Sequence, residues 1–108
     1  MTIYCFDLDG TLCTTNEGDY ELSSPKTHRI AVVNKLYQEG HYVKIFTARG
    51  GTSGQDWTEL THSQLQRWGV LHHELILGKP AADIYVDDKA FSDLFFFSQA
   101  DSEQELPN

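Results

Sequence analysis

Four short apolar runs, each followed at once by polar residues, constrain the fold of this chain more than any other feature. The runs cover residues 3–6, 42–46, 74–77 and 84–86. Short apolar runs separated by helical segments are typical of the buried strands of a parallel sheet. The carboxyl ends of such strands meet at one edge of the sheet, where ligands bind. The polar residues expected to lie together at that edge are Asp7, Asp9, Thr47, Lys79, Asp87 and Asp88.

The residue types at this edge indicate chemistry on a phosphoryl group. Carboxylates are the ligands that a hard cation such as Mg²⁺ prefers, and an aspartate can also act as a nucleophile. A threonine hydroxyl and a lysine ammonium group both bind the anionic oxygens of a phosphate. The sequence therefore predicts a site at which a phosphoryl group is bound and transferred.

The ordered set of polar residues resembles the motifs of the haloacid dehalogenase (HAD) superfamily of phosphatases and phosphotransferases. The first motif of that superfamily, DxDGT, corresponds to Asp7-Leu8-Asp9-Gly10-Thr11. The second is a hydroxyl residue that ends the next strand, here Thr47. The third is Lys79 in Gly-Lys-Pro, and the fourth is the acidic pair Asp87-Asp88. The four motifs occur in order and extend over most of the chain.

The resemblance implies a role for each motif residue. Asp7 is expected to attack phosphorus and become an aspartyl phosphate, while Asp9 protonates the leaving oxygen and then helps to activate water. The residues expected to bind phosphate are Gly10, Thr47, Lys79 and Arg49. The ligands expected for Mg²⁺ are the carboxylates of Asp7 and Asp87 and the backbone carbonyl of Asp9, with Asp88 acting through a water or through Lys79.

Parts of the pattern also have a purely structural interpretation. Asp-Gly is favoured in turns, and Asp-x-Asp-Gly also begins a calcium-binding loop. The calcium pattern fails because its twelfth position is Gly18 instead of glutamate. Asp87 and Asp88 are equally suited to the first turn of a helix, where acids interact favourably with the helix dipole. Arg49 precedes a glycine-rich stretch, and a loop arginine is usually solvated, although its planar fork also suits phosphate.

The order of the runs predicts a single Rossmann-like α/β domain, a doubly wound parallel sheet with helices on both faces. Helices are expected from Ser24-Pro25 to Gly40, from Asp56 to Gly69 and over residues 89–97. By resemblance, residues 1–98 form a HAD-like core without a cap domain, and residues 12–24 form a hairpin flap over the site. Residues 99–108 are expected to be a flexible acidic tail.

The composition narrows the possible partners and location of the chain. Among the 108 residues, 16 acidic against 8 basic side chains give a formal charge of −8, which disfavours binding to nucleic acid. No apolar stretch approaches the ~20 residues that cross a bilayer. The N-terminus lacks the basic segment of a signal peptide, so we expect a cytoplasmic protein. Cys5 and Cys13 lack metal-ligand spacing and are expected to be reduced thiols.

Taken together, these observations predict a Mg²⁺-dependent phosphohydrolase that acts through an aspartyl phosphate. The substrate is expected to be small, and the resemblance favours a phosphorylated sugar or polyol. The alternatives are a phosphotransferase or mutase with the same chemistry, a phosphatase for phosphoproteins or nucleic-acid ends, and a non-catalytic module that binds metal and phosphate. Phe95-Phe96-Phe97 cannot all point inward from one helix, which is consistent with a homo-oligomer.

Overall fold

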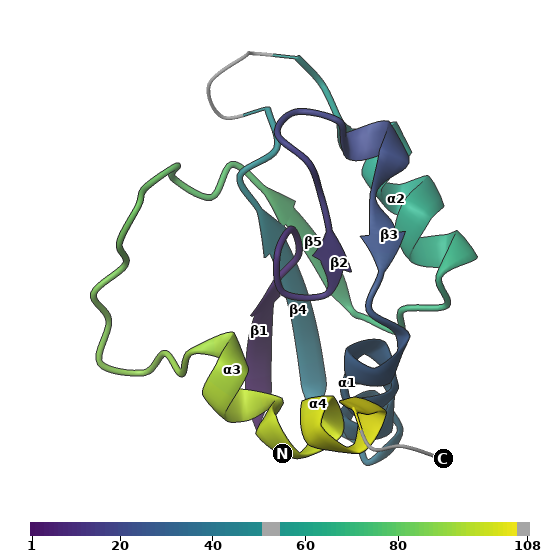
Figure 1. The fold of residues 1–108 in the computed structure, drawn as a ribbon, viewed down its shortest axis with the longest axis vertical. Coiled ribbons are helices and arrows are strands. Elements are labelled where there is room, and N and C mark those ends of the chain that lie inside the picture. The colour runs from purple at the N-terminus through teal and green to yellow at the C-terminus, as the bar shows by residue number, and fades with distance from the viewer. Residues whose placement is uncertain (51–54, 106–108) are drawn as a thin grey trace.

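A parallel sheet of three strands forms the centre of the computed structural model, which describes residues 1–50 and 55–105. The strands are β1 (Ile3–Asp7), β4 (Tyr42–Thr47) and β5 (Glu74–Leu77), arranged in the order β1-β4-β5 (Figure 1). In this register Asp7 lies beside Phe46, and Thr47 lies beside Leu77. The carboxyl ends of the strands therefore meet at one edge, as the first three apolar runs predict.

Helices and one small hairpin connect and follow the strands. The other elements are β2 (Cys13–Thr14), η1 (Tyr20–Leu22), β3 (Ser24–Pro25), α1 (Thr27–Gln38), α2 (Thr58–Arg67), α3 (Asp93–Phe96) and α4 (Ser98–Glu105). The predicted flap segment contains the antiparallel hairpin β2-β3, with the 3₁₀ turn η1 at its tip. Ser24 and Pro25 belong to this hairpin, so α1 begins slightly later than the sequence suggests, at Thr27.

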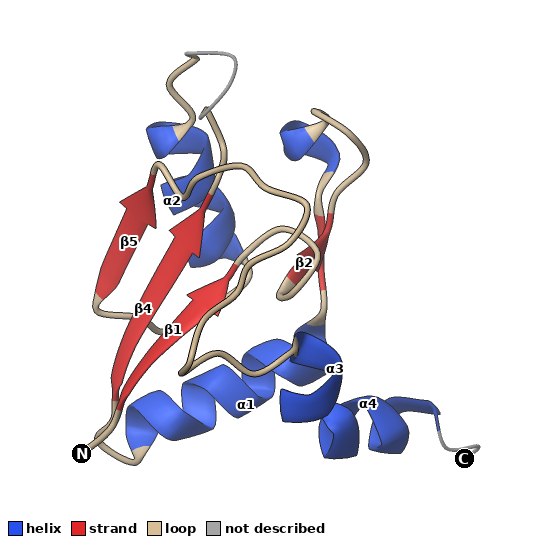
Figure 2. Cartoon of the chain, turned by 90° about the vertical axis from the view of Figure 1, so that its left-hand side faces the viewer, coloured by secondary structure: helices blue, strands red, loops and turns tan. Residues whose placement is uncertain are grey.

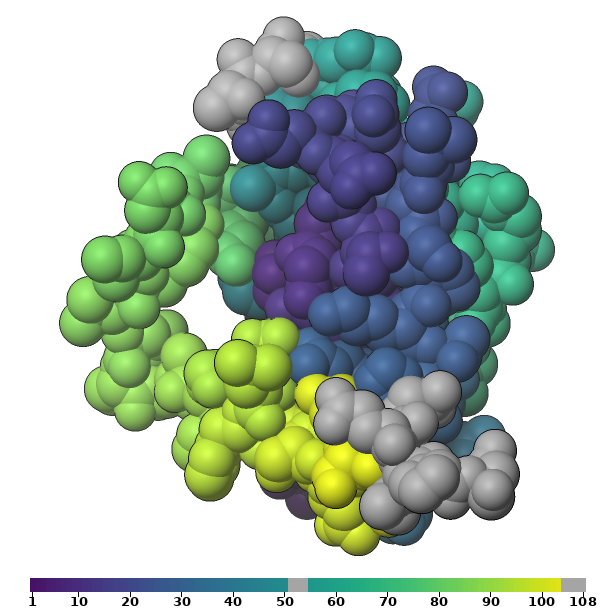
Figure 3. Space-filling model, viewed as in Figure 1, coloured from purple at the N-terminus to yellow at the C-terminus, as the bar shows by residue number. Residues whose placement is uncertain are grey.

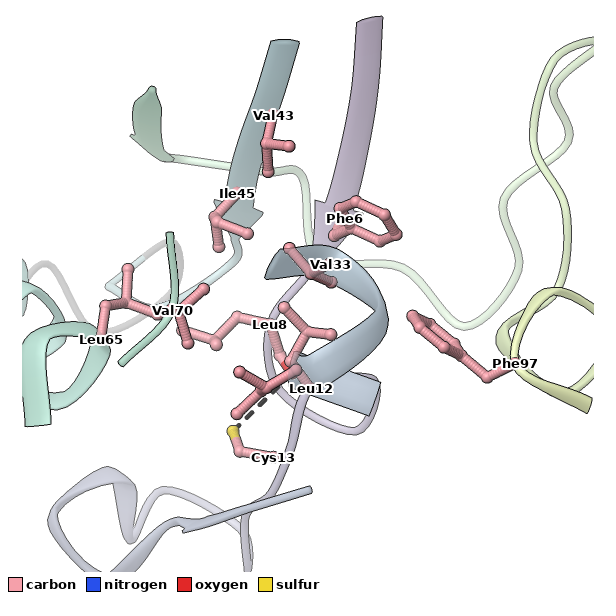
Figure 4. Packing of buried hydrophobic residues seen from close by; sticks show 11 residues of the cluster. Phe6, Leu8, Leu12, Cys13, Val33, Val43, Ile45, Leu65, Val70 and Phe97 are labelled. Atoms are coloured by element: carbon pink, nitrogen blue, oxygen red, sulfur yellow. Dashed lines mark hydrogen bonds between the residues drawn. The ribbon is translucent and has the colours of Figure 1, made fainter. Parts of the chain in front are cut away.

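The hydrophobic core lies on one face of the sheet. Side chains alternate between the two faces of a strand, and the core face carries Phe6 of β1 with Val43 and Ile45 of β4. These side chains meet Val33 of α1 and Leu65 of α2, and all five are buried (Figure 4). Two of the helices predicted from the sequence thus supply the second half of the core.

The chain after β5 also returns to the core face. The ring of Phe97 lies 6.0 Å from that of Phe6, and the ring of Phe96 lies 5.6 Å from Phe6. All four α-helices of the described segments lie on the same side of the sheet (Figure 2). The doubly wound arrangement predicted from the sequence is therefore not seen in the described residues. The opposite face leaves Ile3 60% exposed and Cys5 exposed as well.

Residues 78–92, which we call the arm, bow away from the sheet before the chain returns at α3 (Figures 1 and 3). The prediction of a fourth strand at residues 84–86 is wrong for this conformation, because Ile84 is 79% and Val86 96% exposed and neither pairs with a strand. Only residues 78–83 separate this run from β5, whereas connections between parallel strands need about a dozen residues. The predicted last helix is also shorter, since Ser92 caps α3 and Asp87 and Asp88 remain in the arm.

The acidic end of the chain, expected to be flexible from residue 99, continues as α4 to Glu105, while residues 106–108 lie outside the described part. Asp101 of α4 accepts hydrogen bonds from Nε and Nη2 of Arg29 at 2.9 and 2.6 Å, and lies 2.8 Å from Nε2 of His28. Asp93 accepts a further bond from Arg29 at 2.8 Å. The buried guanidinium group of α1 therefore fastens both terminal helices.

None of the helices in the described segments has the length and apolar character that a membrane crossing requires.

The contact between α1 and α4 predicts an acid-dependent loss of stability. The hydrogen bonds from Arg29 hold the pKa of Asp101 below its ordinary value of 3.8, at about 2. A lowered pKa stabilises the folded state above the unfolded pKa, and this contribution is lost as pH falls from about 3.8 to about 2. We expect Asp101→Asn to lower Tm at neutral pH by about 4–8 °C, which corresponds to about 1 kcal/mol in a domain of this size.

Thermal unfolding followed by circular dichroism between acidic and neutral pH tests this expectation. Glu103→Gln is the matched control, because it removes one negative charge from the exposed side of the same helix. A Tm difference between Asp101→Asn and the wild type that stays constant down to about pH 2 contradicts the assigned role.

Candidate active site

A tight turn directly after β1 positions the first motif. The carbonyl oxygen of Leu8 accepts hydrogen bonds from the amides of Thr11 and Leu12, at 3.2 and 2.8 Å. Leu8 and Leu12 are fully buried and anchor the turn in the core. Gly10 has a φ of 87°, in the left-handed region that glycine adopts most readily. The amide of Gly10 donates to the carbonyl oxygen of Cys13 at 2.8 Å, so this amide is already hydrogen-bonded within the turn.

Asp7 and Lys79 form an ion pair where β1 and β5 end. Nζ of Lys79 donates to Oδ1 of Asp7 at 3.2 Å, and Oγ1 of Thr11 donates to Oδ2 at 3.1 Å. The side chain of Asp7 is 31% exposed and that of Lys79 13%. Solvent therefore reaches the carboxylate of Asp7, whereas most of the Lys79 side chain is shielded from solvent.

The backbone after β5 and two aromatic rings hold Lys79 in place. The amide of Lys79 donates to the carbonyl oxygen of Thr47 at 3.0 Å. Gly78, with a φ of 98°, provides the left-handed backbone conformation just before it. Nζ of Lys79 lies 4.4 Å from the ring centre of Phe46 and 4.2 Å from that of Tyr85, distances at which a ring face attracts a cation. The lysine is thus fixed on the face of the sheet that carries Asp7.

Asp9 belongs to a separate and more buried group. Its carboxylate accepts hydrogen bonds from Nη2 of Arg49 at 2.8 Å, Oγ1 of Thr15 at 2.7 Å and Oγ1 of Thr47 at 3.0 Å. Burial alone raises the pKa of such a carboxyl group, but the hydrogen bonds and charge of Arg49, with help from Thr15 and Thr47, hold the pKa of Asp9 below its ordinary value. In this conformation Asp9 is a bound carboxylate.

Arg49, expected from the sequence to be solvated or to bind phosphate, lies inside the molecule. Its side chain is fully buried, and besides Asp9 its guanidinium donates to Thr61 and Gln64 of α2. The ring of Tyr20 covers the guanidinium at 4.7 Å. These partners leave Arg49 no open side for phosphate in this geometry. The rest of the glycine-rich stretch that follows Arg49, residues 51–54, lies outside the described part of the chain.

Asp87 and Asp88 are the two motif residues that the structure does not bring to this edge. Both lie exposed on the arm, and Oδ1 of Asp87 accepts a hydrogen bond from the amide of Lys89 at 2.8 Å. Within residues 1–50 and 55–105, no three His, Cys, Asp or Glu side chains lie close enough together to hold one metal ion. Both oxygens of Asp7 already accept protein hydrogen bonds. Binding of Mg²⁺ by Asp7, the Asp9 carbonyl and Asp87 therefore stays a prediction.

The arm and the open face of the sheet enclose a hollow of about 1160 Å³ beside Asp7. Its wall includes Asp7, Lys79, Phe46 and Tyr85 as well as the outer edge of β1. Figure 3 shows the opening between the arm and the body of the molecule. A carboxylate and an ammonium group at the wall of an accessible hollow can receive a phosphorylated ligand and bring it to a nucleophile.

Several side chains of the site are not identified by the sequence motifs. Thr15, Tyr20 and Gln64 complete the surroundings of Asp9 and Arg49, and Tyr85 completes those of Lys79. Thr15 and Tyr20 fall in the segment predicted to form the flap, which was the one signal available for them. Gln64 sits in a predicted helix between Ser63 and Leu65, and nothing in its local sequence distinguishes it.

Comparison with known proteins identifies shared folds and no named family. No protein-family model matches the chain, and no curated protein matches it. The crystal structure of an MCSG target from Vibrio cholerae is 26% identical with a TM-score of 0.76, and the match covers 97% of this chain and 100% of that one. A chain in the structure of the Pnkp1/Rnl/Hen1 complex is 24% identical with a TM-score of 0.57, over 88% of this chain and 33% of that one. This second likeness concerns the fold alone.

The buried pair predicts a large, pH-dependent cost when Arg49 is replaced. Arg49→Met leaves the Asp9 carboxylate partly buried without its cation, which destabilises a protein by about 3 kcal/mol or more. The pKa of Asp9 then rises, because burial is no longer opposed by Arg49. We therefore expect the loss in the free energy of unfolding to be larger at about pH 7 than at about pH 4. Urea denaturation at the two pH values measures both effects.

The double variant Arg49→Met with Asp9→Asn serves as the control. Because it removes the unpaired charge, it should recover part of the stability lost at neutral pH. A double variant that is less stable than Arg49→Met by the full cost of Asp9→Asn alone would show that the two residues do not interact.

Proposed function

We propose that this chain is a phosphohydrolase of the HAD type that cleaves a phosphate monoester through an aspartyl phosphate on Asp7. The observation that carries the proposal is the pair of Asp7 and Lys79, 3.2 Å apart at the carboxyl edge of a parallel sheet and on the wall of a hollow. The nucleophile and the positive charge that it needs are therefore adjacent. The order of the motifs supports the family assignment.

Lys79 supports attack by Asp7 because two negatively charged groups must approach each other. Its ammonium group offsets the repulsion between the carboxylate and the incoming phosphate. An oxygen of Asp7 forms a bond to phosphorus, and the bond from phosphorus to the leaving oxygen breaks. The leaving oxygen takes up a proton. Water then hydrolyses the aspartyl phosphate, which releases inorganic phosphate and restores the Asp7 carboxylate.

Asp9 is the proposed source of the proton, but the structure holds it as a carboxylate. Its lowered pKa means that few molecules carry the proton at neutral pH while Arg49 is in contact. Proton donation by Asp9 therefore requires its contact with Arg49 to weaken when substrate is bound. A substrate with a good leaving group, such as an aryl phosphate, depends less on this step than an alkyl phosphate does.

The proposed cofactor is Mg²⁺, which when bound offsets charge on phosphoryl oxygens. Asp7 and the backbone carbonyl of Asp9 are the donors that one chain supplies at this edge, and Mg²⁺ usually takes one or two carboxylates together with waters and substrate phosphate. The remaining carboxylates of the motif set lie on the arm. Waters, the substrate phosphate or one further carboxylate would complete the coordination of Mg²⁺ at this edge.

The proposed substrate is a small phosphorylated sugar or polyol. The hollow beside Asp7 is accessible, and its wall offers polar groups such as Asp83 and Lys89 beside the catalytic pair. The charge of −8 disfavours nucleic-acid ends. Cys5 and Cys13 are both free thiols, which agrees with a reducing compartment, so we place the protein in the cytoplasm.

Replacement of the nucleophile is the direct test. We expect Asp7→Asn to lower kcat for a generic aryl phosphate by at least about 10³-fold in the presence of Mg²⁺, because the amide does not attack phosphorus. The circular dichroism spectrum should stay unchanged, since the asparagine oxygen can accept from Lys79 while its amide nitrogen donates to the hydroxyl of Thr11. Phosphate release by Asp7→Asn at the wild-type rate would rule out the mechanism.

Two controls make that result specific. Glu39→Gln removes one exposed carboxylate at the end of α1 and should leave kcat unchanged. Inorganic phosphate and the alcohol product should also appear in equal amounts, since an excess of alcohol would identify a phosphotransferase. Absence of phosphate release by the wild type, with and without Mg²⁺, would support a non-catalytic module that only binds phosphate.

A further inference from the structure

We propose that two copies of this chain exchange their arms. Residues 84–86 of each copy form a fourth strand on the free edge of β1 in the other copy, so that Asp87 of one copy lies beside Asp7 of its partner. The exchange of strands stands on the fold alone. The shared site rests on the proposed function, because it assigns Asp87 to the centre that contains the nucleophile.

The outer edge of β1 is available for a strand. β1 is the terminal strand in the order β1-β4-β5, and no described segment pairs with its other side. An unpaired edge presents a row of backbone N–H and C=O groups that readily accept another strand. Ile3 of β1 is 60% exposed, so an added strand also covers apolar surface.

The arm contains a run of residues typical of a strand, and the apolar side chains of this run are exposed. Ile84 and Val86 are 79% and 96% exposed, and Phe91 at its far end is 68% exposed. A single segment that exposes several large apolar side chains usually marks a contact surface. The run is followed by Asp87, just as β1 ends in Asp7. Its residue pattern therefore matches the strands that do form.

The arm cannot fill this position in its own chain. Its first end is fixed where Lys79 contacts Asp7, and its second end continues into α3, whose Phe96 packs on Phe6. It runs from the carboxyl edge of the sheet toward α3, opposite in direction to β1 (Figures 1 and 2). To lie parallel to β1, the chain must return along the sheet within residues 78–83, which is about half of the dozen residues that such a connection needs.

A second copy removes this obstacle. A two-fold axis perpendicular to β1 reverses the direction of the partner, so the partner's arm runs parallel to β1 of the first copy. The hollow of about 1160 Å³ between β1 and the arm is the space that the partner's arm enters, at the ~4.8 Å spacing of neighbouring strands. By the same symmetry, the arm of the first copy pairs with β1 of the partner, which gives a closed dimer.

The exchange also brings a second carboxylate to the edge of the sheet that carries Asp7. With Asp87 in register with Asp7, the two carboxylates come from different copies and meet at the same edge of the extended sheet. Neighbouring carboxylates repel each other, and each copy carries a charge of −8, so a divalent cation between them stabilises the pair. Mg²⁺ should therefore favour the dimer as well as the reaction.

A disulfide tests the exchange without reference to activity. The register that aligns Asp87 with Asp7 places position 85 beside Cys5, which is exposed on β1. Adjacent strands bring Cα atoms to about 5 Å, within the range of a disulfide. We expect Tyr85→Cys, after mild oxidation, to migrate as a covalent dimer of twice the 12.3 kDa chain mass. Tyr85→Cys combined with Cys5→Ser should remain monomeric under the same denaturing conditions.

Each other outcome of this experiment overturns the exchange. A disulfide within one chain shows that the arm folds onto its own β1, and failure to form any disulfide with Cys5 shows that the strands are not adjacent. Light scattering of the reduced protein is the second measurement. The wild type should have the mass of a dimer, and Val86→Lys should shift it toward the monomer, because charge on an edge strand opposes pairing.

Complementation tests whether Asp87 acts in the partner's site. Asp7→Asn and Asp87→Asn should each be inactive alone, yet co-expression should restore about a quarter of wild-type activity, since random pairing gives half mixed dimers with one intact site each. No recovery together with an interchain disulfide overturns the shared site and leaves the exchange intact. An inactive wild type, combined with an interchain disulfide in Tyr85→Cys, refutes the proposed function instead.

Discussion

The buried ion pair between Arg49 and Asp9 is the interaction on which the rest of the site depends. Arg49 follows β4, Asp9 follows β1, and the remaining guanidinium contacts reach Thr61 and Gln64 of α2 and the ring of Tyr20 in the flap segment. One side chain therefore connects two strand ends, a helix and the hairpin region. A guanidinium group suits this place because its planar fork donates several hydrogen bonds in fixed directions.

The sequence predicts those parts of the fold and site that depend on local pattern. Each apolar run that became a strand carries its own signal, and parallel register then brings Asp7, Thr47 and Lys79 to one edge without further information. Asp9 follows from its place in the turn after β1. The placement of these residues, though not their roles, therefore follows from the runs alone.

The remaining features depend on partners that are distant in the sequence. Asp101 pairs with Arg29 across 72 positions, and this contact orders a helix whose own sequence is merely polar and acidic. From the sequence, Arg49 is expected to be solvated because it precedes a glycine-rich stretch. Its partners Thr61 and Gln64 lie more than ten residues away and cannot be inferred from the local sequence. The run at residues 84–86 has the pattern of a strand, but six connecting residues prevent it from joining its own sheet in parallel. The residue pattern thus predicts a strand, whereas the length of the connection determines which sheet edge the strand can reach.

The aromatic surroundings of Lys79 have a thermodynamic consequence. Phe46 belongs to the rigid sheet, whereas Tyr85 belongs to the arm, so the cation is shared between a fixed ring and a ring that moves with the arm. An anion that draws the ammonium group away from Tyr85 weakens one attachment of the arm. The coupling is reciprocal. If the arm moves so that Tyr85 no longer contacts Lys79, the free energy of anion binding to Lys79 changes by the same amount. The affinity of Lys79 for an anion and the position of the arm are therefore thermodynamically linked.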